Sequence, residues 1–423
     1  MDRETIHHKI HTGLLQAIAF TLPFSIKLNN ALIILCLLNW LIGGKVISKT
    51  RQAFSNPVNL LMLAFFLVHI TSVLFSSNTA EAWAIAERRL PLIVFPLLVF
   101  NQHILSCFKK VLLSFCAGVT LAGLICISRA SWLFFDQGLY TGFFYHKLSS
   151  AIGINAVYLS AYSVLSIIIL LNTAEIRTKG IKELLICFLL LLSVLLSSKM
   201  MLFILVLYLL LHISRRVKST GYKKLGAAGL VVICALVFLI PGVRKRFNKE
   251  FSSKFNVVTQ SHYTYDTPFS GTSLRLVLWK QSLAIVRSEN AWLTGVGSGD
   301  FQDKLNEKYK ETGMYVGDPA NNNTGYTGYG PHNQYIETLL YSGIPGLFIF
   351  ILLLALQLRS AIRWGNWMWG AFAILCMLFF LSESALSTNK GIVFYALFST
   401  LFYARSYFNS SHTGYKDDFS ISI

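Results

Sequence analysis

The segment GYGPHNQYIETLLYSGIPGLFIFILLLALQL, residues 328–358, begins polar and glycine-rich and ends as an apolar run. A membrane-spanning helix needs about 20 mostly apolar residues, and 334–358 is long enough. His332, Asn333 and Glu337 lie at the start of that run. Polar groups at a membrane are costly and usually functional, so this segment predicts a membrane helix with reactive groups at its outer end.

Apolar runs of this kind recur along the whole chain. Of its 423 residues, 54% are hydrophobic and 13% are charged, whereas a soluble domain is about 25% charged. The runs are continuous in Leu, Ile, Val and Phe and do not alternate as the strands of a membrane β-barrel do. We therefore expect an all-α polytopic membrane protein.

The apolar runs predict twelve membrane-spanning helices and one large connection between the ninth and the tenth. The spans lie near 12–26, 30–44, 57–75, 89–101, 110–128, 151–172, 182–197, 199–213, 225–241, 334–358, 366–382 and 391–407. The expected organisation is helices one to nine in 1–241, a loop domain with amphipathic helices in 242–331, helices ten to twelve in 332–410, and a tail in 411–423.

Lysine and arginine in the short connections predict the orientation. Most of them, including the dense cluster from Arg215 to Lys224, fall in connections on the side that also holds both termini. Cytoplasmic connections are enriched in these residues. Both termini and the tail should therefore be cytoplasmic, and the loop domain should face outward.

Within the loop domain, Ser273 is the expected cap of an amphipathic helix that carries Arg275 in its first turn and Trp279 on its apolar face. The turn GVGSGD, residues 295–300, follows this helix. At the next membrane helix, His332 and Asn333 occupy the first turn, where unpaired backbone N–H groups favour an anion.

Two sequence blocks resemble a known family. His332-Asn333, nine residues and then the GIPG of 343–346 resemble the H-N-x9-G-x-x-G signature of the O-antigen ligase and polymerase superfamily. Arg275, Trp279 and the glycine-rich turn ahead of Phe301 resemble its R-x3-W…G-x-G-x-G-x-F segment. The predicted topology is also similar to that of the family, so the resemblance extends over essentially the whole chain.

The resemblance implies a GT-C type glycosyltransferase of the bacterial inner membrane with a periplasmic active site. The donor would be a glycan linked to polyprenyl (undecaprenyl) pyrophosphate, and the ligase acceptor would be a sugar of lipid A–core. The reaction would need no metal or other cofactor. By position, His332 would activate the acceptor hydroxyl and Arg275 would bind the donor pyrophosphate. A third basic position, Arg in the family, is Lys199 here, which cannot bind phosphate in a bidentate manner.

Several further residues are candidates for the same site. Arg88 and Arg89 precede the fourth span and are secondary phosphate candidates, with headgroup anchoring as the alternative. Asn333 and Glu337 would support the site from one helix face. Glu383 would orient His332 or a sugar hydroxyl, or it would pair with Lys390.

Other functions are less compatible with the sequence. It contains no Walker A loop, dinucleotide fingerprint, HExxH or zinc-ligand spacing. The net charge of +18 reflects the basic cytoplasmic connections, so we expect no nucleic-acid partner. The alternatives are a polymerase that joins lipid-linked repeat units, a protein-directed transferase and a secondary transporter. We expect a monomer that transfers glycan with inversion and contacts membrane lipids.

Overall fold

The structure is a computed structural model that describes residues 3–173, 180–224, 226, 228, 229, 242–244, 248, 255–318, 321 and 323–412. Over these residues the regular secondary structure is helical, and the one β-type pairing is an isolated bridge between Asp318 and Asn323. The all-α prediction is confirmed for the described part of the chain.

The N-terminal part of the chain contains one long helix, α7, among shorter ones. These are α1 (Arg3–Thr21), α2 (Ile26–Ile42), α3 (Val46–Ala53), α4 (Pro57–Val73), α5 (Thr79–Arg88), α6 (Pro91–Val99), α7 (Ile104–Gln137), η1 (Tyr140–Phe143), α8 (Tyr145–Ser149), η2 (Ser150–Ile152), α9 (Ala156–Asn172), α10 (Ile181–Leu196) and α11 (Lys199–Arg216).

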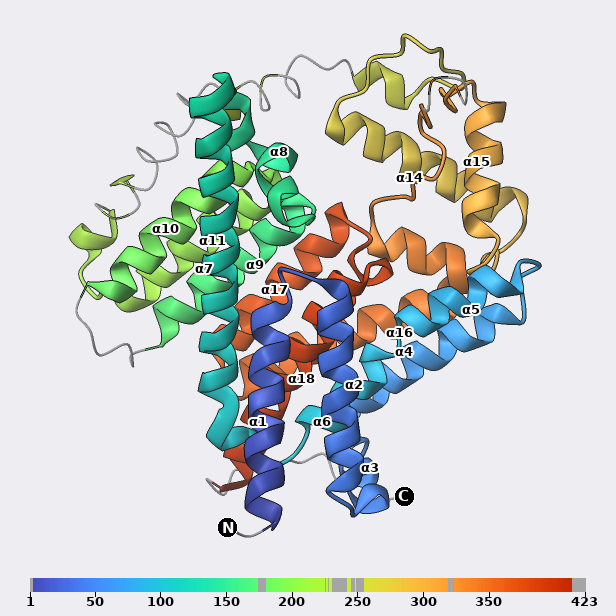
Figure 1. Cartoon of the computed structure of the whole chain (residues 1–423). Coiled ribbons are helices and arrows are strands. Elements are labelled where there is room, and N and C mark those ends of the chain that lie inside the picture. The colour runs from blue at the N-terminus through green and yellow to red at the C-terminus, as the bar shows by residue number, and fades with distance from the viewer. Residues whose placement is uncertain are drawn as a thin grey trace.

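The remainder contains the loop domain and the last membrane helices. These are η3 (Phe255–Val258), α14 (Gly271–Ser288), α15 (Phe301–Glu311), α16 (Gln334–Arg363), α17 (Trp367–Ser382), η5 (Ala385–Ser387) and α18 (Asn389–His412). Helices α1 to α3 form one end of the molecule, α16 to α18 run through its centre, and α14 and α15 lie at the opposite end (Figure 1).

Asparagine caps begin many of these helices. The side chains of Asn56, Asn78, Asn155, Asn333 and Asn366 each accept a hydrogen bond from a backbone N–H in the first turn. Such caps satisfy N–H groups that have no partner within the helix. In a membrane protein, where water is scarce, this local signal fixes where each helix starts.

The number of spans is only partly supported. Among the described residues, two helices, α7 and α16, are long and apolar enough to cross a membrane, and bent pairs raise the number to four. Every predicted span contains a helix except 225–241, which lies almost wholly outside the described residues. The molecule is therefore a membrane protein, and the twelve-span topology stays a prediction.

The structure corrects several predicted boundaries. Helix α7 extends over 34 residues, well beyond 110–128. The predicted span 151–172 begins within one helical segment, Tyr145–Ile152, and continues in another, Ala156–Asn172. The two segments meet at an angle of 82°. As expected, α10 and α11 are separate, because Ser197 has a left-handed φ of 48°. Helix α16 is broken at Gly343, where φ is 65° and ψ is −164°.

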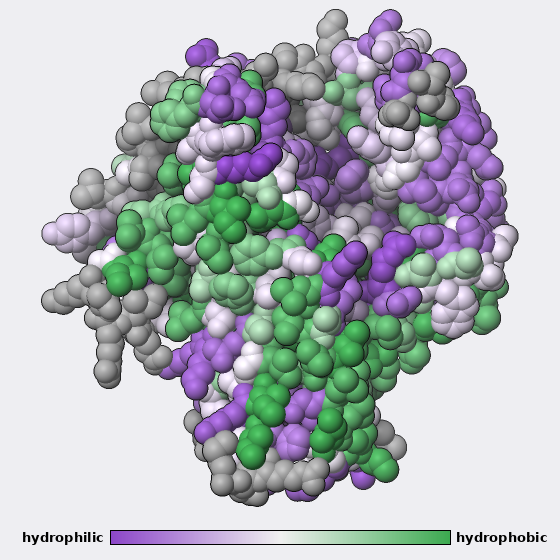
Figure 2. Space-filling model, in the orientation of Figure 1, coloured by the Kyte–Doolittle hydropathy of each residue, from purple (hydrophilic) through white to green (hydrophobic). Residues whose placement is uncertain are grey.

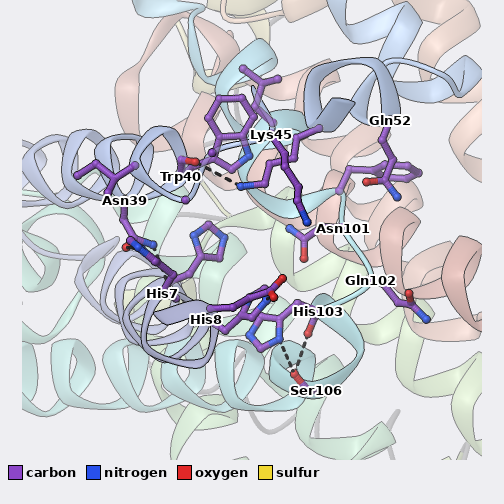
Figure 3. A pocket seen from close by; sticks show the side chains of 18 of the residues that line it. His7, His8, Asn39, Trp40, Lys45, Gln52, Asn101, Gln102, His103 and Ser106 are labelled. Carbon is purple, nitrogen blue, oxygen red and sulfur yellow. Dashed lines mark hydrogen bonds and ion pairs between the residues drawn. The ribbon is translucent and has the colours of Figure 1, made fainter. Parts of the chain in front are cut away.

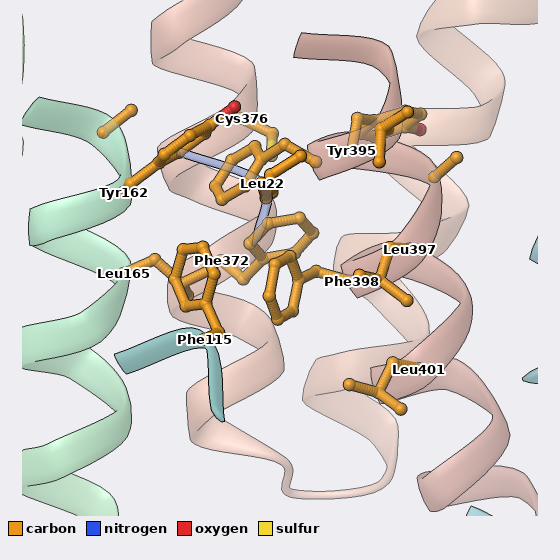
Figure 4. Close-up of a cluster of buried hydrophobic side chains, with 14 of the residues drawn as sticks. Leu22, Phe115, Tyr162, Leu165, Phe372, Cys376, Tyr395, Leu397, Phe398 and Leu401 are labelled. Atoms are coloured by element: carbon orange, nitrogen blue, oxygen red, sulfur yellow. The ribbon is translucent and has the colours of Figure 1, made fainter. Parts of the chain in front are cut away.

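Aromatic and aliphatic side chains fill the centre of the helix bundle. Phe115 of α7 packs edge-on against Phe398 of α18 with ring centroids 4.7 Å apart, and Leu165 of α9 and Phe372 of α17 are buried in the same cluster (Figure 4). A Cβ at Gly118 would overlap the Phe20 carbonyl, so glycine lets α7 approach α1 closely. Small residues serve this purpose in membrane bundles.

The loop domain has its own small core beneath a hydrophilic surface. Val277, Leu278, Leu305 and Tyr309 of α14 and α15 are buried together with Leu340 of α16. Hydrophilic residues gather over α14 and α15, and the hydrophobic surface lies over α1, α2, α4 and α10 (Figure 2). This division is consistent with a domain outside the membrane attached to a bundle within it.

The cap of α14 also differs from the prediction. Ser270, and not Ser273, is the N-cap, and its side chain accepts from the Ser273 N–H, while the Ser273 hydroxyl accepts from the Ser270 N–H. Arg275 consequently lies in the second turn of α14 and not in the first.

Candidate active site

A polar pocket of about 600 Å³ lies where the loop domain meets the bundle. Five parts of the chain contribute to it: α5, the start of α9, the start of α15, the segment around His332 with α16, and the connection from α17 to α18. Its charged and aromatic lining residues are Glu81, Arg88, Tyr158, Phe301, Asp303, His332, Glu337, Tyr341 and Glu383.

His332, Glu383 and Arg275 form a chain of polar contacts at this pocket. His332 Nδ1 lies 3.1 Å from Glu383 Oε2, and an Arg275 terminal nitrogen donates to Glu383 Oε1 over 2.8 Å. The Glu383 side chain is 7% exposed, whereas those of His332 and Arg275 are 37% and 30% exposed. A buried carboxylate therefore fixes two partly accessible basic groups.

These contacts determine which ring nitrogen of His332 is free. An ionised carboxylate only accepts hydrogen bonds, so Nδ1 carries the hydrogen that it donates to Glu383. The lone pair of neutral His332 is then on Nε2. A histidine oriented in this way by a carboxylate is suited to accept a proton. His332 also has a left-handed φ of 48°, a strained conformation that is common at functional sites.

Arg275 and Trp279 explain the R-x3-W spacing. Residues four apart share one face of a helix, and this face of α14 meets the His332 segment and the end of α17. Trp279 Nε1 donates to the Pro331 carbonyl over 2.9 Å, and Arg275 Nε donates to the Ser382 carbonyl over 3.1 Å. Helix α14 thus holds Pro331, the residue before His332, and Ser382, the residue before Glu383.

Asn333 connects the start of α16 to the end of α17. Its Oδ1 accepts from the N–H groups of Tyr335 and Ile336, and its Nδ2 donates to the Leu381 carbonyl. These contacts correct the expectation that the first-turn N–H groups are open to an anion, because Asn333 already caps two of them. These contacts fix the position of Asn333, the residue next to His332.

The glycines of the two motif blocks allow the loop domain to dock on α16. Val296 N–H donates to the Leu340 carbonyl, and Ile344 N–H donates to the Trp292 carbonyl, each over 2.7 Å. A Cβ at Gly295 would lie 2.5 Å from backbone atoms of Tyr341 and Ser342. The break in α16 therefore frees backbone groups that pair with Trp292 and with Val296 of the GVGSGD turn.

The same turn also contacts the connection between α4 and α5. Asp300 accepts hydrogen bonds from the N–H groups of Ser77 and Asn78 over 2.7 and 2.8 Å. Burial by itself raises the pKa of the Asp300 carboxyl, but these bonds outweigh that effect, and the pKa lies below its ordinary value of 3.8. The ionised carboxylate thus holds α5, and Arg88 at its end, next to the pocket.

The structure separates the roles of Arg88 and Arg89. Arg88 lines the pocket, is 45% exposed and donates to Glu81 over 3.1 Å. Arg89 is fully buried, lies 3.7 Å from Glu337 and donates to the Leu386 carbonyl. A ligand in the pocket therefore does not reach the Arg89 guanidinium, and its contacts are structural.

Lys199 and Glu383 also have defined positions. Lys199 is the first residue of α11. Near the other end of that helix, Arg215 lies 4.4 Å from the Trp367 ring at the start of α17. Lys199 is not among the residues that line the pocket. Lys390 donates to the Pro23 carbonyl. Glu383 pairs with Arg275 and His332, and the alternative Lys390 pairing was wrong.

The sequence did not identify several residues of the site. Tyr158 lines the pocket from α9, and Ser387 donates to Glu337. Gln334 accepts from the Leu386 N–H over 2.7 Å. The contacts between α16 and the α17–α18 connection join residues about fifty positions apart, which no local spacing reveals. The one available signal was the polar run SESALSTNK, residues 382–390, between two apolar helices.

No group of three or more His, Cys, Asp or Glu suited to a metal ion occurs in the described part of the chain. Among the charged groups that line the pocket, Arg88 contacts Glu81, His332 contacts Glu383, and Glu337 contacts buried Arg89. Arg88 at this pocket, with Arg275 on the other side of Glu383, can attract an anionic group, and His332 can accept a proton.

Comparison with known proteins supports the family resemblance. No match was found among curated proteins. The family model described as O-antigen ligase matches residues 183–351. This region contains Lys199, Arg275, Trp279 and His332 and ends before Glu383. The match confirms that the chain resembles the O-antigen ligase superfamily, as the two sequence blocks predicted.

Proposed function

We propose that this protein is an O-antigen ligase that transfers a glycan from undecaprenyl pyrophosphate to a sugar hydroxyl of lipid A–core, on the periplasmic face of the bacterial inner membrane. The observation that carries this proposal is the contact between His332 and buried Glu383 at the wall of a polar pocket. The match to the O-antigen ligase family supports the general reaction, ligation or polymerisation of lipid-linked glycan.

In the proposed reaction, the acceptor oxygen attacks the anomeric carbon of the donor glycan. The bond from that carbon to the pyrophosphate oxygen breaks, the acceptor proton moves to His332 Nε2, and polyprenyl pyrophosphate leaves. Attack opposite the leaving group inverts the anomeric centre. Fixed cations stabilise the negative charge that develops on a leaving group. Arg88, Arg275 and Lys199 are the proposed cations.

Glu383 keeps His332 in the reactive tautomer throughout this step. When Nε2 takes the proton, the imidazolium gains a charged partner 3.1 Å away. Asn333, Glu337 and Arg89 act indirectly by fixing the segments that carry the pair. We propose that no metal participates, because the protein's own cations occupy the role that a divalent ion would have.

A reconstituted assay tests this proposal. Purified protein is given lipid-linked glycan with or without lipid A–core, and products are separated by gel and their linkage is read by NMR. We expect a product with inverted anomeric configuration only when lipid A–core is present. The rate of its formation should be unchanged by chelator. A polymer formed from donor alone would support the polymerase alternative.

The same assay tests His332. We expect His332→Ala to lower the rate by about 10²–10⁴-fold, the usual contribution of a general base. The control is His262→Ala, which removes an exposed histidine of the loop domain. If folded His332→Ala transferred glycan at the rate of the control, His332 would not be the base.

A further inference from the structure

A second cavity lies at the opposite end of the molecule from the loop domain. It encloses about 950 Å³ and is formed by the start of α1, the turn from α2 to α3 and the connection from α6 to α7. These elements lie at the end of the molecule marked by the N-terminus (Figure 1), and Figure 3 shows the cavity from close by. In the proposed orientation it opens at the cytoplasmic boundary, and the proposed reaction does not use it.

Basic groups dominate the lining of this cavity. Lys45 and Lys49 line it together with His7, His8, His11 and His103. Among the described residues that line it, Glu4 is the one carboxylate, and its side chain is 72% exposed. The two lysines outnumber this carboxylate, and such an excess of positive charge attracts an anion.

The fold brings the two lysines over the cavity. Gly44 and Lys45 both have left-handed φ values, 68° and 55°, and the chain bends by 120° between α2 and α3. Because of this bend, α3 returns across the end of α2. Lys49 Nζ then lies 3.4 Å from the Trp40 carbonyl and 5.7 Å from the centre of the Trp40 ring.

Histidine and amide side chains form the opposite wall. The rings of His8 and His103 stack with centroids 4.3 Å apart. His7 Nδ1 donates to Asn39 Oδ1 over 3.1 Å, which leaves Nε2 on the other side of that ring. The Asn101 amide lines the cavity as well (Figure 3). The wall is therefore polar, and its rings are held in place.

Exposed apolar residues border the cavity. Leu41, Ile42 and Ile47 are 44%, 61% and 88% exposed, and they flank the turn that carries Lys45. A cationic cavity beside an apolar border fits an amphiphile with an anionic head. Basic pockets between membrane helices on the cytoplasmic side bind lipid headgroups in this way.

We propose that this cavity binds a phosphate group, presented by an anionic membrane lipid whose acyl chains lie along Leu41, Ile42 and Ile47. Lys45 and Lys49 bind the phosphate oxygens, and the second N–H of the Asn101 amide, which donates its first to the Leu98 carbonyl, completes the site. This inference does not depend on the proposed transfer reaction, because it concerns the other end of the molecule.

The test measures the melting temperature of the purified full chain in nanodiscs. The discs contain phosphatidylcholine alone, phosphatidylcholine with increasing phosphatidylglycerol, or phosphatidylcholine with inorganic phosphate. A ligand that binds only the folded state raises the melting temperature. We expect phosphatidylglycerol to raise that of the wild type. An equal rise in melting temperature with inorganic phosphate would overturn the assignment of the ligand as a lipid. The cavity would then be a site for free phosphate.

Matched variants locate the effect. Lys45→Gln/Lys49→Gln should weaken the apparent affinity for phosphatidylglycerol about tenfold or more, since each charge-assisted contact typically contributes at least that much. Lys109→Gln/Lys110→Gln, an exposed pair on α7 outside the cavity, removes the same charge and should respond like the wild type.

Gln52→Glu provides a second variant that keeps both lysines. Gln52 is exposed and lines the cavity, so a carboxylate there should repel phosphate and weaken binding without disturbing the turn. Equal responses of the cavity variants and the Lys109/Lys110 control would overturn the proposal in favour of general attraction to headgroups.

Discussion

At Glu383, the two carboxylate oxygens have different partners. Oε1 accepts from Arg275 and Oε2 from His332. Arg275 donates to one oxygen of the carboxylate, and the contact of the other oxygen with Nδ1 selects the tautomer of His332. In the proposed reaction Glu383 acts through these two neighbours, and its contribution depends on the geometry of Arg275.

Arg275→Lys tests this dependence. The guanidinium donates through Nε to Ser382 and through a terminal nitrogen to Glu383, and an ammonium group cannot reproduce that fork. We expect the rate to fall by about 10- to 100-fold, the equivalent of one charge-assisted hydrogen bond. Arg287→Lys, exposed in the last turn of α14, is the control. Similar rates for both variants would contradict the role given to the fork.

The residues of the site were predictable to different degrees. The resemblance to the family's R-x3-W pattern identified Arg275 with Trp279, and the boundary of an apolar run identified His332. The separation of Arg88 from Arg89 was not predictable, because adjacent residues differ here only in which helix face is buried. The pairing of Arg89 with Glu337 joins distant parts of the chain and has no local signature.

At the scale of elements, the break in α16 is the feature that joins the loop domain to the bundle. Gly343 has a left-handed φ, and a Cβ there would lie 2.5 Å from the Leu293 backbone. Both the conformation and the close approach require glycine. The G-x-G-x-G and G-x-x-G patterns therefore record one docking contact between two segments.

Gly343→Ala should destabilise this contact more than Gly328→Ala. Both glycines have left-handed φ values, but a Cβ at Gly328 meets no atom within 4 Å. A left-handed conformation alone costs about 1–2 kcal/mol in a non-glycine residue, and Gly343→Ala adds overlap with backbone. We expect a lower melting temperature and lower transfer for Gly343→Ala. Equal losses in the two variants would show that backbone conformation, and not packing, is what matters.

The Asp300 contact predicts a dependence on pH. Its folded-state pKa lies below 3.8, so the ionised form stabilises docking at neutral pH, and this contribution is lost as the pH falls below 3.8 through the folded-state pKa. Asp300→Asn should lower the melting temperature near neutral pH and flatten its decline on acidification. Asp303→Asn removes the same charge nearby. A wild-type decline retained in Asp300→Asn would assign the pH dependence to other groups.

The apolar runs predicted the presence of helices well and the ends of helices poorly. The end of α7 at Gln137 and the bend before α9 lie in mixed sequence, where apolar content does not mark a boundary. Ser270 and Ser273 are both suitable N-caps for α14 by residue type. The path of the chain decides between them, and Ser270 is the cap. Caps, and not hydropathy, set these ends.

At the scale of the whole molecule, two polar cavities lie at opposite ends of an apolar bundle. The candidate active site is beneath the loop domain, and the lysine-lined cavity is beside α3. In the proposed reaction, the candidate active site must face the side of the membrane where donor and acceptor are both exposed, so the orientation of the chain matters for function. The excess of basic residues around α3 predicts that its end is cytoplasmic.

Two exposed positions allow this orientation to be measured. Tyr265 in the loop domain and Ile47 in α3 are 72% and 88% exposed, and they lie toward opposite ends of the molecule. Each is replaced by cysteine in a variant without native cysteines and treated in intact spheroplasts with a membrane-impermeant maleimide. We expect Tyr265→Cys to be labelled directly and Ile47→Cys only after the membrane is permeabilised, since the positive-inside excess places α3 in the cytoplasm. The cysteine-free parent controls for background. Direct labelling of Ile47→Cys, with protection of Tyr265→Cys, would place His332 on the cytoplasmic side. A periplasmic transfer reaction would then be impossible, and the phosphate cavity would face outward.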